Sequence, residues 1–376
     1  MPVPLLDLSK QYASIRAEVD AAIADTVASQ QFIMGPGVAR LESEVAGRTG
    51  ARHAIGCASG TDAILLSIKA LPLEPGAEVI VPAFTFFATA GAVWNAGFTP
   101  VFCDVDPDTF NVTAATLEAA LTERTRVIVV VHLYGQMAEM QPILELAERR
   151  GLFVIEDAAQ SIGARQQFNG GWAESGTIGD TGCLSFFPTK NLGGFGDGGM
   201  ILANDDVLAE KLRKLRVHGG RQMYHHEMVG TNSRLDAIQA AVLSAKLPHL
   251  AVWTEHRREN ARGYDELLSG IDGVRIPKVQ ANNYHVYNQY TIRVRSRDAL
   301  KAHLDARGIG NSIYYPVPLH LQECFASLGC KPGDFPVSEA ASAEVLSIPV
   351  FPELTRAQLE EVAAAIREFY EPHGGE

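Results

Sequence analysis

Short apolar runs alternate along the first half of the chain with segments in which apolar residues recur at helical spacing. The runs include Ile55 and residues 79–81, 101–102, 127–131 and 153–155. Each run is typical of a buried strand, and strands that alternate with helical patterns indicate βαβ units in a parallel sheet. The pattern therefore predicts an α/β fold in which helices flank a mostly parallel sheet.

The same pattern divides the chain into two domains. Leu235, Ile238 and Val242 recur at helical spacing before the turn-like segment 247–249, and beyond it residues 290–294 resemble a strand and residues 300–306 a helix. A chain of 376 residues can form two hydrophobic cores. We expect a large domain over residues 1–250 and a smaller C-terminal α/β domain over residues 251–376. An amphipathic helix near residues 12–27 is expected to pack on the small domain or on a dimer seam.

Candidate chemistry begins with Lys190, which lies between an apolar strand-like run and the glycine-rich segment 193–199. Glycines remove side-chain bulk and allow a flat ligand to lie close to the backbone. A partly desolvated lysine at such a place has a lowered pKa and can attack a carbonyl group. A surface lysine before a flexible loop accounts for the same residues, so other positions must decide between the two interpretations.

Asp157 ends the apolar run 153–157 and is followed by small residues. Open α/β sheets bind their ligands at the carboxyl ends of the strands. A carboxylate there can hold a proton on a heteroaromatic nitrogen, which a pyridoxal phosphate ring needs in order to accept electrons. Capping of the next turn is the structural alternative.

A third segment combines hydroxyl groups and a glycine, because Ser59, Gly60 and Thr61 precede apolar residues at helical spacing. Free N–H groups and the dipole at the start of a helix favour an anion such as phosphate. Ordinary N-capping by Ser59 or Thr61 explains the same residues.

Taken together and in this order, these segments resemble the DegT/DnrJ/EryC1/StrS family of sugar aminotransferases, which are fold-type I enzymes that use pyridoxal 5'-phosphate. The resemblance covers nearly the whole chain. The segments that carry it are residues 32–37, 59–63, 81–89, 100–106, 156–160, 185–200, 230–236 and 314–316. Each segment alone is unspecific, whereas the ordered set is highly specific.

The resemblance implies a role for each matching residue. Lys190 is implied to be the Schiff-base lysine and the general acid and base, and Asp157 the partner of the ring nitrogen. The other implied cofactor contacts are Gln160 near the phenolic oxygen, Phe86 on the ring face, Gly60, Thr61 and Ser185 at the phosphate, and Asn232 from the other subunit. The implied substrate contacts are Arg234, Tyr315 and His320.

Plainer roles remain open for several of these residues. Phe86 is by default a core residue, the Ser185 hydroxyl can be solvated, and Arg234 can form an exposed ion pair of little energetic value. Tyr315 and His320 lie in a proline-containing loop that packing alone would explain.

The resemblance also implies an activity, namely transfer of an amino group from L-glutamate to a keto nucleotide sugar by a homodimer with shared active sites. Residues 224–236 are closest to relatives that act on 3-keto sugars, which indicates an amino sugar for glycans or glycosylated natural products. Relatives that dehydrate sugars carry histidine at the lysine position, so Lys190 favours amino transfer. Alternative acceptors are a 4-keto sugar, a keto-inositol or an aminobenzoate precursor. Alternative classes are a noncatalytic regulator that keeps the cofactor and a plain nucleotide-sugar-binding protein.

The composition agrees with a cytoplasmic enzyme. A formal net charge of -12 and a pI of about 5.4 argue against binding to nucleic acid or to an anionic membrane. The N-terminal segment lacks the pattern of a signal peptide, the longest conspicuous apolar run is too short to cross a bilayer, and the five cysteines form no CxxC pair. We expect no metal site, because residues 104–115 lack the glycine and glutamate of a calcium loop and residues 225–227 lack a third ligand.

Overall fold

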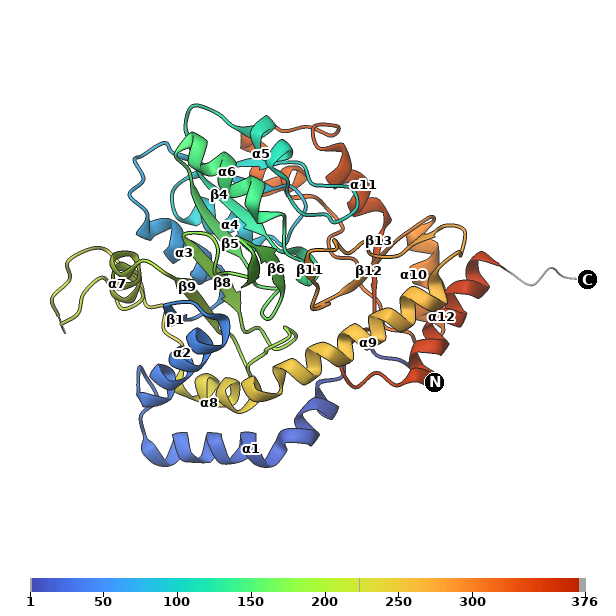
Figure 1. Ribbon diagram of the computed structural model, residues 1–376, viewed down its shortest axis with the longest axis horizontal. Helices are drawn as coiled ribbons and strands as arrows, with labels where there is room; N and C mark the ends of the chain where they lie inside the picture. Colours follow the sequence, from blue (N-terminus) through green and yellow to red (C-terminus); the bar gives the residue numbers. More distant parts are fainter. Residues whose placement is uncertain (1, 223, 372–376) are drawn as a thin grey trace, which may run out of the picture.

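The computed structural model of this chain describes residues 2–222 and 224–371. At its centre is a seven-stranded sheet with the order β1-β9-β8-β5-β4-β2-β3 (Figure 1). Among the described strands of this sheet, β9 alone runs in the opposite direction to the others. The strands are β1 (His53–Cys57), β2 (Glu78–Pro82), β3 (Thr99–Cys103), β4 (Thr125–Val131), β5 (Phe153–Asp157), β8 (Thr181–Ser185) and β9 (Gly199–Ala203). The expected α/β fold with a mostly parallel sheet is confirmed.

Both faces of this sheet are buried, which explains the continuous apolar runs in the sequence. Val127 and Val129 of β4 point into one core, and Ile128 and Val130 point into another. The helices over the first face are α3 (Gly60–Ala70), α4 (Ala88–Asn95) and α7 (Asp206–Leu215). The helices over the second face are α5 (Ala114–Ala120) and α6 (Met140–Arg150), with α2 (Pro36–Thr49) and α8 (Ala237–Lys246) near β8 and β9.

The C-terminal part contains an antiparallel sheet with the order β10-β12-β13 and a core of its own. Its elements are α9 (Leu250–Leu268), β10 (Val274–Arg275), β12 (Tyr290–Val294), α10 (Arg297–Ala306), β13 (Val345–Ile348) and α12 (Arg356–Tyr370). In Figure 1, the long helix α9 runs from α8 toward this part. The two-domain division near residue 250 stays a prediction, because α11 (Pro336–Glu344) also packs into the core beneath the main sheet.

Several elements are too short for hydrophobic periodicity to predict. A small sheet joins β6 (Arg165–Phe168), β7 (Gly171–Glu174) and β11 (Asn283–Tyr284). The short 3-10 helices are η1 (Leu133–Gly135), η2 (Leu247–His249), η3 (Leu319–Leu321) and η4 (Glu323–Leu328). Within residues 2–222 and 224–371, no helix combines the length and the apolar character needed to span a membrane.

The N-terminal helix α1 (Leu8–Ser29) packs mainly on α8, where Ile15 and Val19 meet Val242. Figure 1 shows α1 lying along the lower edge of the molecule beside α8. α1 also reaches the C-terminal part, because Trp253 of α9 belongs to the same cluster and Lys10 Nζ lies 5.9 Å from the centroid of the Phe351 ring. Val3, which precedes α1, is buried in the C-terminal core. A dimer seam along this helix stays a prediction.

Candidate active site

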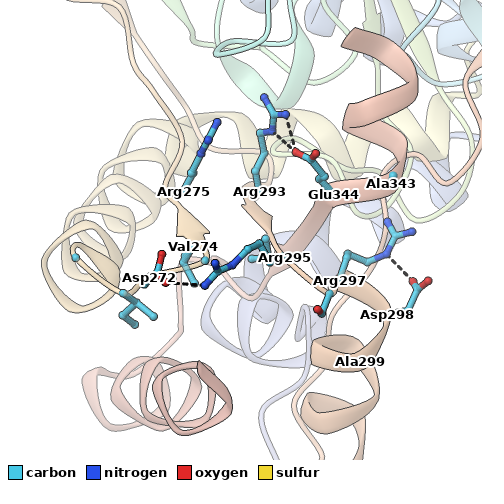
Figure 2. Close-up of a pocket in the computed structure, with 15 residues that line it drawn as sticks. Asp272, Val274, Arg275, Arg293, Arg295, Arg297, Asp298, Ala299, Ala343 and Glu344 are labelled. Atoms are coloured by element: carbon cyan, nitrogen blue, oxygen red, sulfur yellow. Dashed lines mark hydrogen bonds and ion pairs between the residues drawn. The ribbon is translucent and has the colours of Figure 1, made fainter. Parts of the chain in front are cut away.

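A hollow of about 1070 Å³ lies on the C-terminal part and is lined by four arginines (Figure 2). Three of them form ion pairs at 2.6 to 2.7 Å, namely Arg293–Glu344, Arg295–Asp272 and Arg297–Asp298. Most of the positive charge is therefore neutralised within the chain. None of the residues expected to carry chemistry lines this hollow.

Most of the expected site residues converge instead at the carboxyl edge of the main sheet. Asp157 is the last residue of β5, Ser185 is the last residue of β8, and Gly60 opens α3. They line a cavity of about 430 Å³. The expected residues in its wall are Gly60, Thr61, Phe86, Asp157, Gln160, Ser185, Lys190 and Tyr315. The fold thus brings residues from segments that lie far apart in the sequence together in one cavity.

Asp157 is a buried carboxylate, with only 6% of its surface exposed. The Thr89 hydroxyl donates to Oδ2 at 2.8 Å, and the Ala159 N–H donates to Oδ1 at 3.2 Å. Burial raises the pKa of Asp157, whereas these hydrogen bonds and the charge of Lys190 lower it. Each carboxylate oxygen has a second lone pair, so Asp157 can accept a further hydrogen bond from a ligand in the cavity.

Lys190 lies in the turn that follows β8, and its N–H donates to the Phe187 carbonyl at 2.9 Å. The side chain is partly accessible through the cavity but is surrounded by protein, and this burial lowers the pKa of its amine to about 8. The negative charge of Asp157 acts in the opposite direction. Near neutral pH the amine is therefore unprotonated, and nucleophilic, far more often than an ordinary lysine amine.

The start of α3 is suited to an anion. Ser59 caps this helix by accepting the Asp62 N–H at 3.1 Å, so the plain capping role applies to Ser59. Gly60 lies so close to Ser185 that a Cβ on it would be 2.8 Å from the Ser185 Cβ. Gly60, Thr61 and Ser185 line the cavity together. N–H groups of the first turn of α3 and the hydroxyl groups can therefore donate hydrogen bonds to a phosphate there.

Aromatic and amide side chains form another wall. Phe86 is 55% exposed and is therefore not a core residue. Its ring centroid lies 5.9 Å from that of Tyr315. The Gln160 amide donates to the Tyr315 hydroxyl at 2.9 Å and accepts the Tyr134 N–H at 2.6 Å. These bonds orient Gln160, while Phe86 presents an apolar surface to a flat ligand.

His320 is not in the cavity, which corrects the expectation that it contacts substrate. Its buried ring packs on Phe102 and Phe335 at centroid distances of 6.5 and 4.7 Å. Its Nε2 lies 3.1 Å from the Glu339 carboxylate. The short helix η3 turns the ring into the core, so the alternative of a packed structural loop describes His320.

Asn232 and Arg234 also lie outside the cavity of their own chain. Arg234 lines a separate hollow of about 1020 Å³, together with Ile33, Met34 and several residues between 217 and 230. Asn232 is exposed and pairs with Val217 in a β-bridge. A contribution of either residue to a cavity of the kind described above therefore requires a second copy of the chain.

Thr89 was not among the residues predicted from the sequence, although its hydroxyl contacts Asp157 directly. Other residues in the wall of the cavity were not predicted either, among them Thr85, Asp197, Gln289 and Tyr314. Thr89 belongs to the segment 81–89 that carries the family resemblance, and this was its one available signal. No local pattern indicates a contact between positions 68 residues apart.

The segment that resembles a calcium loop has a structural use. Asp104 accepts the N–H groups of Val337 and Ser338 at 2.9 and 2.8 Å and so caps α11. Among the residues that the structure describes, no three His, Cys, Asp or Glu side chains are grouped in the manner of metal ligands.

The sequence profile of the DegT/DnrJ/EryC1/StrS aminotransferase family matches residues 13–367. This chain belongs to that family. Membership confirms the resemblance stated above, and it confirms the expectation of a fold-type I aminotransferase whose cofactor is pyridoxal 5'-phosphate.

Three relatives are similar over nearly their whole length. A pleiotropic regulatory protein of Geobacillus stearothermophilus is 52% identical over 98% of this chain and 99% of its own. A UDP-N-acetyl-3-dehydro-alpha-D-glucosamine 3-aminotransferase of Acidithiobacillus ferrooxidans is 48% identical over 97% of each chain. The crystal structure of DesV from S. venezuelae in complex with a ketimine intermediate has a TM-score of 0.95 and 43% identity, and the match covers 98% of this chain and 99% of DesV.

The residues of the cavity fit pyridoxal 5'-phosphate. Asp157 would hold the proton of the ring nitrogen, Lys190 would bind the carbonyl carbon, and the start of α3 with Ser185 would bind the phosphate. A side chain at residue 60 would collide with Ser185, so glycine at this position lets the start of α3 and Ser185 lie side by side. When bound, the cofactor supplies an electron sink for negative charge on the carbon that carries the transferred amine.

The lowered pKa of Lys190 predicts unusual reactivity. In protein stripped of cofactor, trace acetic anhydride should label Lys190 with a midpoint near pH 8. At pH 8 about half of such amines are unprotonated, compared with roughly 0.3% of amines with a pKa of 10.5. Peptide mass spectrometry across a pH series measures the labelling, with the exposed Lys69 of α3 as internal reference. A midpoint for Lys190 equal to that of Lys69 would show that the cavity does not activate this amine.

Proposed function

We propose that this enzyme transfers an amino group from L-glutamate to a keto nucleotide sugar, with the keto group at carbon 3, to make an amino sugar for glycans or glycosylated natural products. The observation that carries the proposal is the presence of Lys190 and Asp157 in one cavity beside the start of α3. The nucleotide sugar and the carbon position are supported by the name of the Acidithiobacillus ferrooxidans relative. A cytoplasmic location stays a prediction.

The side chains of the cavity divide the work of this reaction. The side-chain amine of Lys190, with its pKa of about 8, can remove the proton from the carbon that carries the transferred amino group and then donate it to another atom. Asp157 as a carboxylate keeps the ring nitrogen of the cofactor protonated. Gln160, oriented by Tyr134 and Tyr315, lies in the cavity wall and would contact the phenolic oxygen of the cofactor.

The charges of the cavity indicate that one chain does not complete the site. Glutamate carries two carboxylates and a nucleotide sugar carries a diphosphate, yet Lys190 is the one cationic side chain in the described cavity wall, which also holds Asp157 and Asp197. The separate hollow beside residues 217–234 carries Arg234 and also Arg221, which is paired with Glu210. We infer that a second copy in a two-fold homodimer brings this segment, with Asn232, over the cavity and supplies positive charge.

A regulator that keeps the cofactor is the second candidate function, because the Geobacillus stearothermophilus relative is named a regulatory protein. Retention of both Lys190 and Asp157 in the cavity favours the enzyme. Glutamate distinguishes the two functions, since an aminotransferase converts the bound cofactor to its amine form and changes its visible absorbance. An unchanged spectrum at saturating glutamate would favour the regulator.

The proposed position of the keto group predicts a substrate preference. Given a 3-keto and a 4-keto nucleotide sugar that are otherwise alike, the enzyme should aminate the 3-keto compound with at least about tenfold higher kcat/KM, because differential transition-state binding sets specificity. Coupled assays with both compounds at several concentrations measure the ratio. A preference for the 4-keto compound would refute the carbon position while leaving amino transfer intact.

The shared site predicts recovery of activity in mixed dimers. Lys190→Ala and Asn232→Ala each damage every site of a homodimer, but a mixed dimer has one site with both lesions and one with neither. Random pairing makes about half of the dimers mixed, so roughly a quarter of all sites should regain activity after coexpression.

The control for this experiment is the pure Asn232→Ala dimer, which must be strongly impaired for the comparison to be informative. Mixed dimers can be isolated with two affinity tags and assayed directly. If isolated mixed dimers are no more active than the separate variants, then Asn232 does not act in the partner's site.

A further inference from the structure

The Asp157 carboxylate accepts a hydrogen bond from a side chain to which the proposed reaction assigns no role. Thr89 is completely buried, and its hydroxyl oxygen lies 2.8 Å from Asp157 Oδ2. In the described part of the chain, the other hydrogen-bond neighbour of this hydroxyl is the Thr85 hydroxyl, at the longer distance of 3.4 Å. Since a threonine hydroxyl has one proton, the shorter contact to the stronger acceptor identifies Asp157 as the group that receives it.

The place of Thr89 in its helix explains why the hydroxyl is available. In helices, a threonine hydroxyl often donates a hydrogen bond to the backbone carbonyl one turn earlier. Thr89 is the second residue of α4 (Ala88–Asn95), so the residue four positions earlier, Thr85, lies outside the helix. The first turn also carries the positive end of the helix dipole, which favours a carboxylate beside it. The helix dipole and the Thr89 hydroxyl therefore both favour the ionised form of Asp157.

Asp157 needs such support because burial opposes its charge. Burial raises its pKa, and the bond from Thr89 is the largest influence that lowers it. The second bond, from the Ala159 N–H, comes from the backbone two residues away at 3.2 Å, so it follows the local turn. Thr89 is thus the side chain, from a separate element of the fold, that joins α4 to the end of β5.

We propose that Thr89 is a positioning residue for Asp157: its hydroxyl fixes the orientation of the carboxylate and keeps it ionised, so that Asp157 can hold the proton of the cofactor's ring nitrogen. This inference rests on the proposed aminotransferase function. Removal of the hydroxyl alone should make Asp157 more basic. Asp157 then competes for the proton of the ring nitrogen, and the ring nitrogen loses positive charge.

Two pairs of variants separate the hydroxyl from the shape of the side chain. Thr89→Val keeps the shape and removes the hydroxyl, whereas Thr89→Ser keeps the hydroxyl. Thr89→Ala and Thr89→Ser form a second pair that differs by the hydroxyl, in case the valine variant does not fold. Thr254→Val is the matched control, since Thr254 is also a buried threonine but donates to the Leu250 carbonyl at 2.8 Å in α9.

The first measurement needs no substrate. The visible absorbance of the holoenzyme is measured across a pH series. The midpoint of the change reports the protonation of the nitrogen that joins Lys190 to the cofactor. A protonated ring nitrogen lowers this midpoint by charge repulsion. We expect the midpoint to rise by about 0.5 to 1 pH unit in Thr89→Val and Thr89→Ala, and to stay within about 0.2 unit of wild type in Thr89→Ser and Thr254→Val.

The second measurement is the single-turnover rate with glutamate. Loss of a hydrogen bond to a charged group predicts a first-order rate about 10- to 100-fold lower in Thr89→Val, with Thr89→Ser within about threefold of wild type. If the valine and alanine variants match Thr254→Val in both measurements, Thr89 is only a packing residue and the proposal is overturned. A wild-type enzyme that does not react with glutamate would refute the proposed donor instead, and the pH midpoints would still decide the role of Thr89.

Discussion

The burial of the Asp157 carboxylate is the constraint on which the rest of the site depends. β5 lies in the middle of the seven-stranded sheet, so its carboxyl end is enclosed by neighbouring strands and the segments that follow them. A carboxylate in such a place is stable only with hydrogen-bond donors and positive charge nearby. The order of the strands supplies both, because α4 follows β2 and carries Thr89, and the turn after β8 carries Lys190. Structural stability and acid–base chemistry therefore require the same contacts.

The glycine-rich segment 193–199 serves packing as well as ligand access. A Cβ on Gly193 would lie 2.2 Å from the Pro188 carbonyl oxygen, so the segment folds directly onto the turn that carries Lys190. From the other side, Lys246 of α8 donates to the Gly193 carbonyl at 2.7 Å. The position of the reactive amine is thus set by a chain of contacts that reaches from α8 to the cavity. A flexible loop, which was the plain interpretation of these glycines, does not describe this arrangement.

Much of the fold and part of the site could be predicted from the sequence, and the limits have physical causes. Buried parallel strands such as β4 are continuous apolar runs, and Lys190 and Asp157 belong to segments whose composition points to their chemistry. The direction of β9 could not be predicted, because composition does not record strand direction. His320 was misplaced because a short loop helix, without periodicity, decides which way its ring turns. Thr89 depends on a contact across 68 positions, and the roles proposed for Asn232 and Arg234 depend on a second chain.

The most direct test of the account is to fix the bond between the cofactor and its lysine. Borohydride reduction of the holoenzyme, followed by peptide mass spectrometry, identifies the attached side chain. The account predicts the mass of the reduced cofactor on the peptide that contains Lys190 and on no other, and no label in Lys190→Ala. A label on another lysine, including the buried Lys246, or the absence of any label, would contradict the assignment of this cavity as the active site.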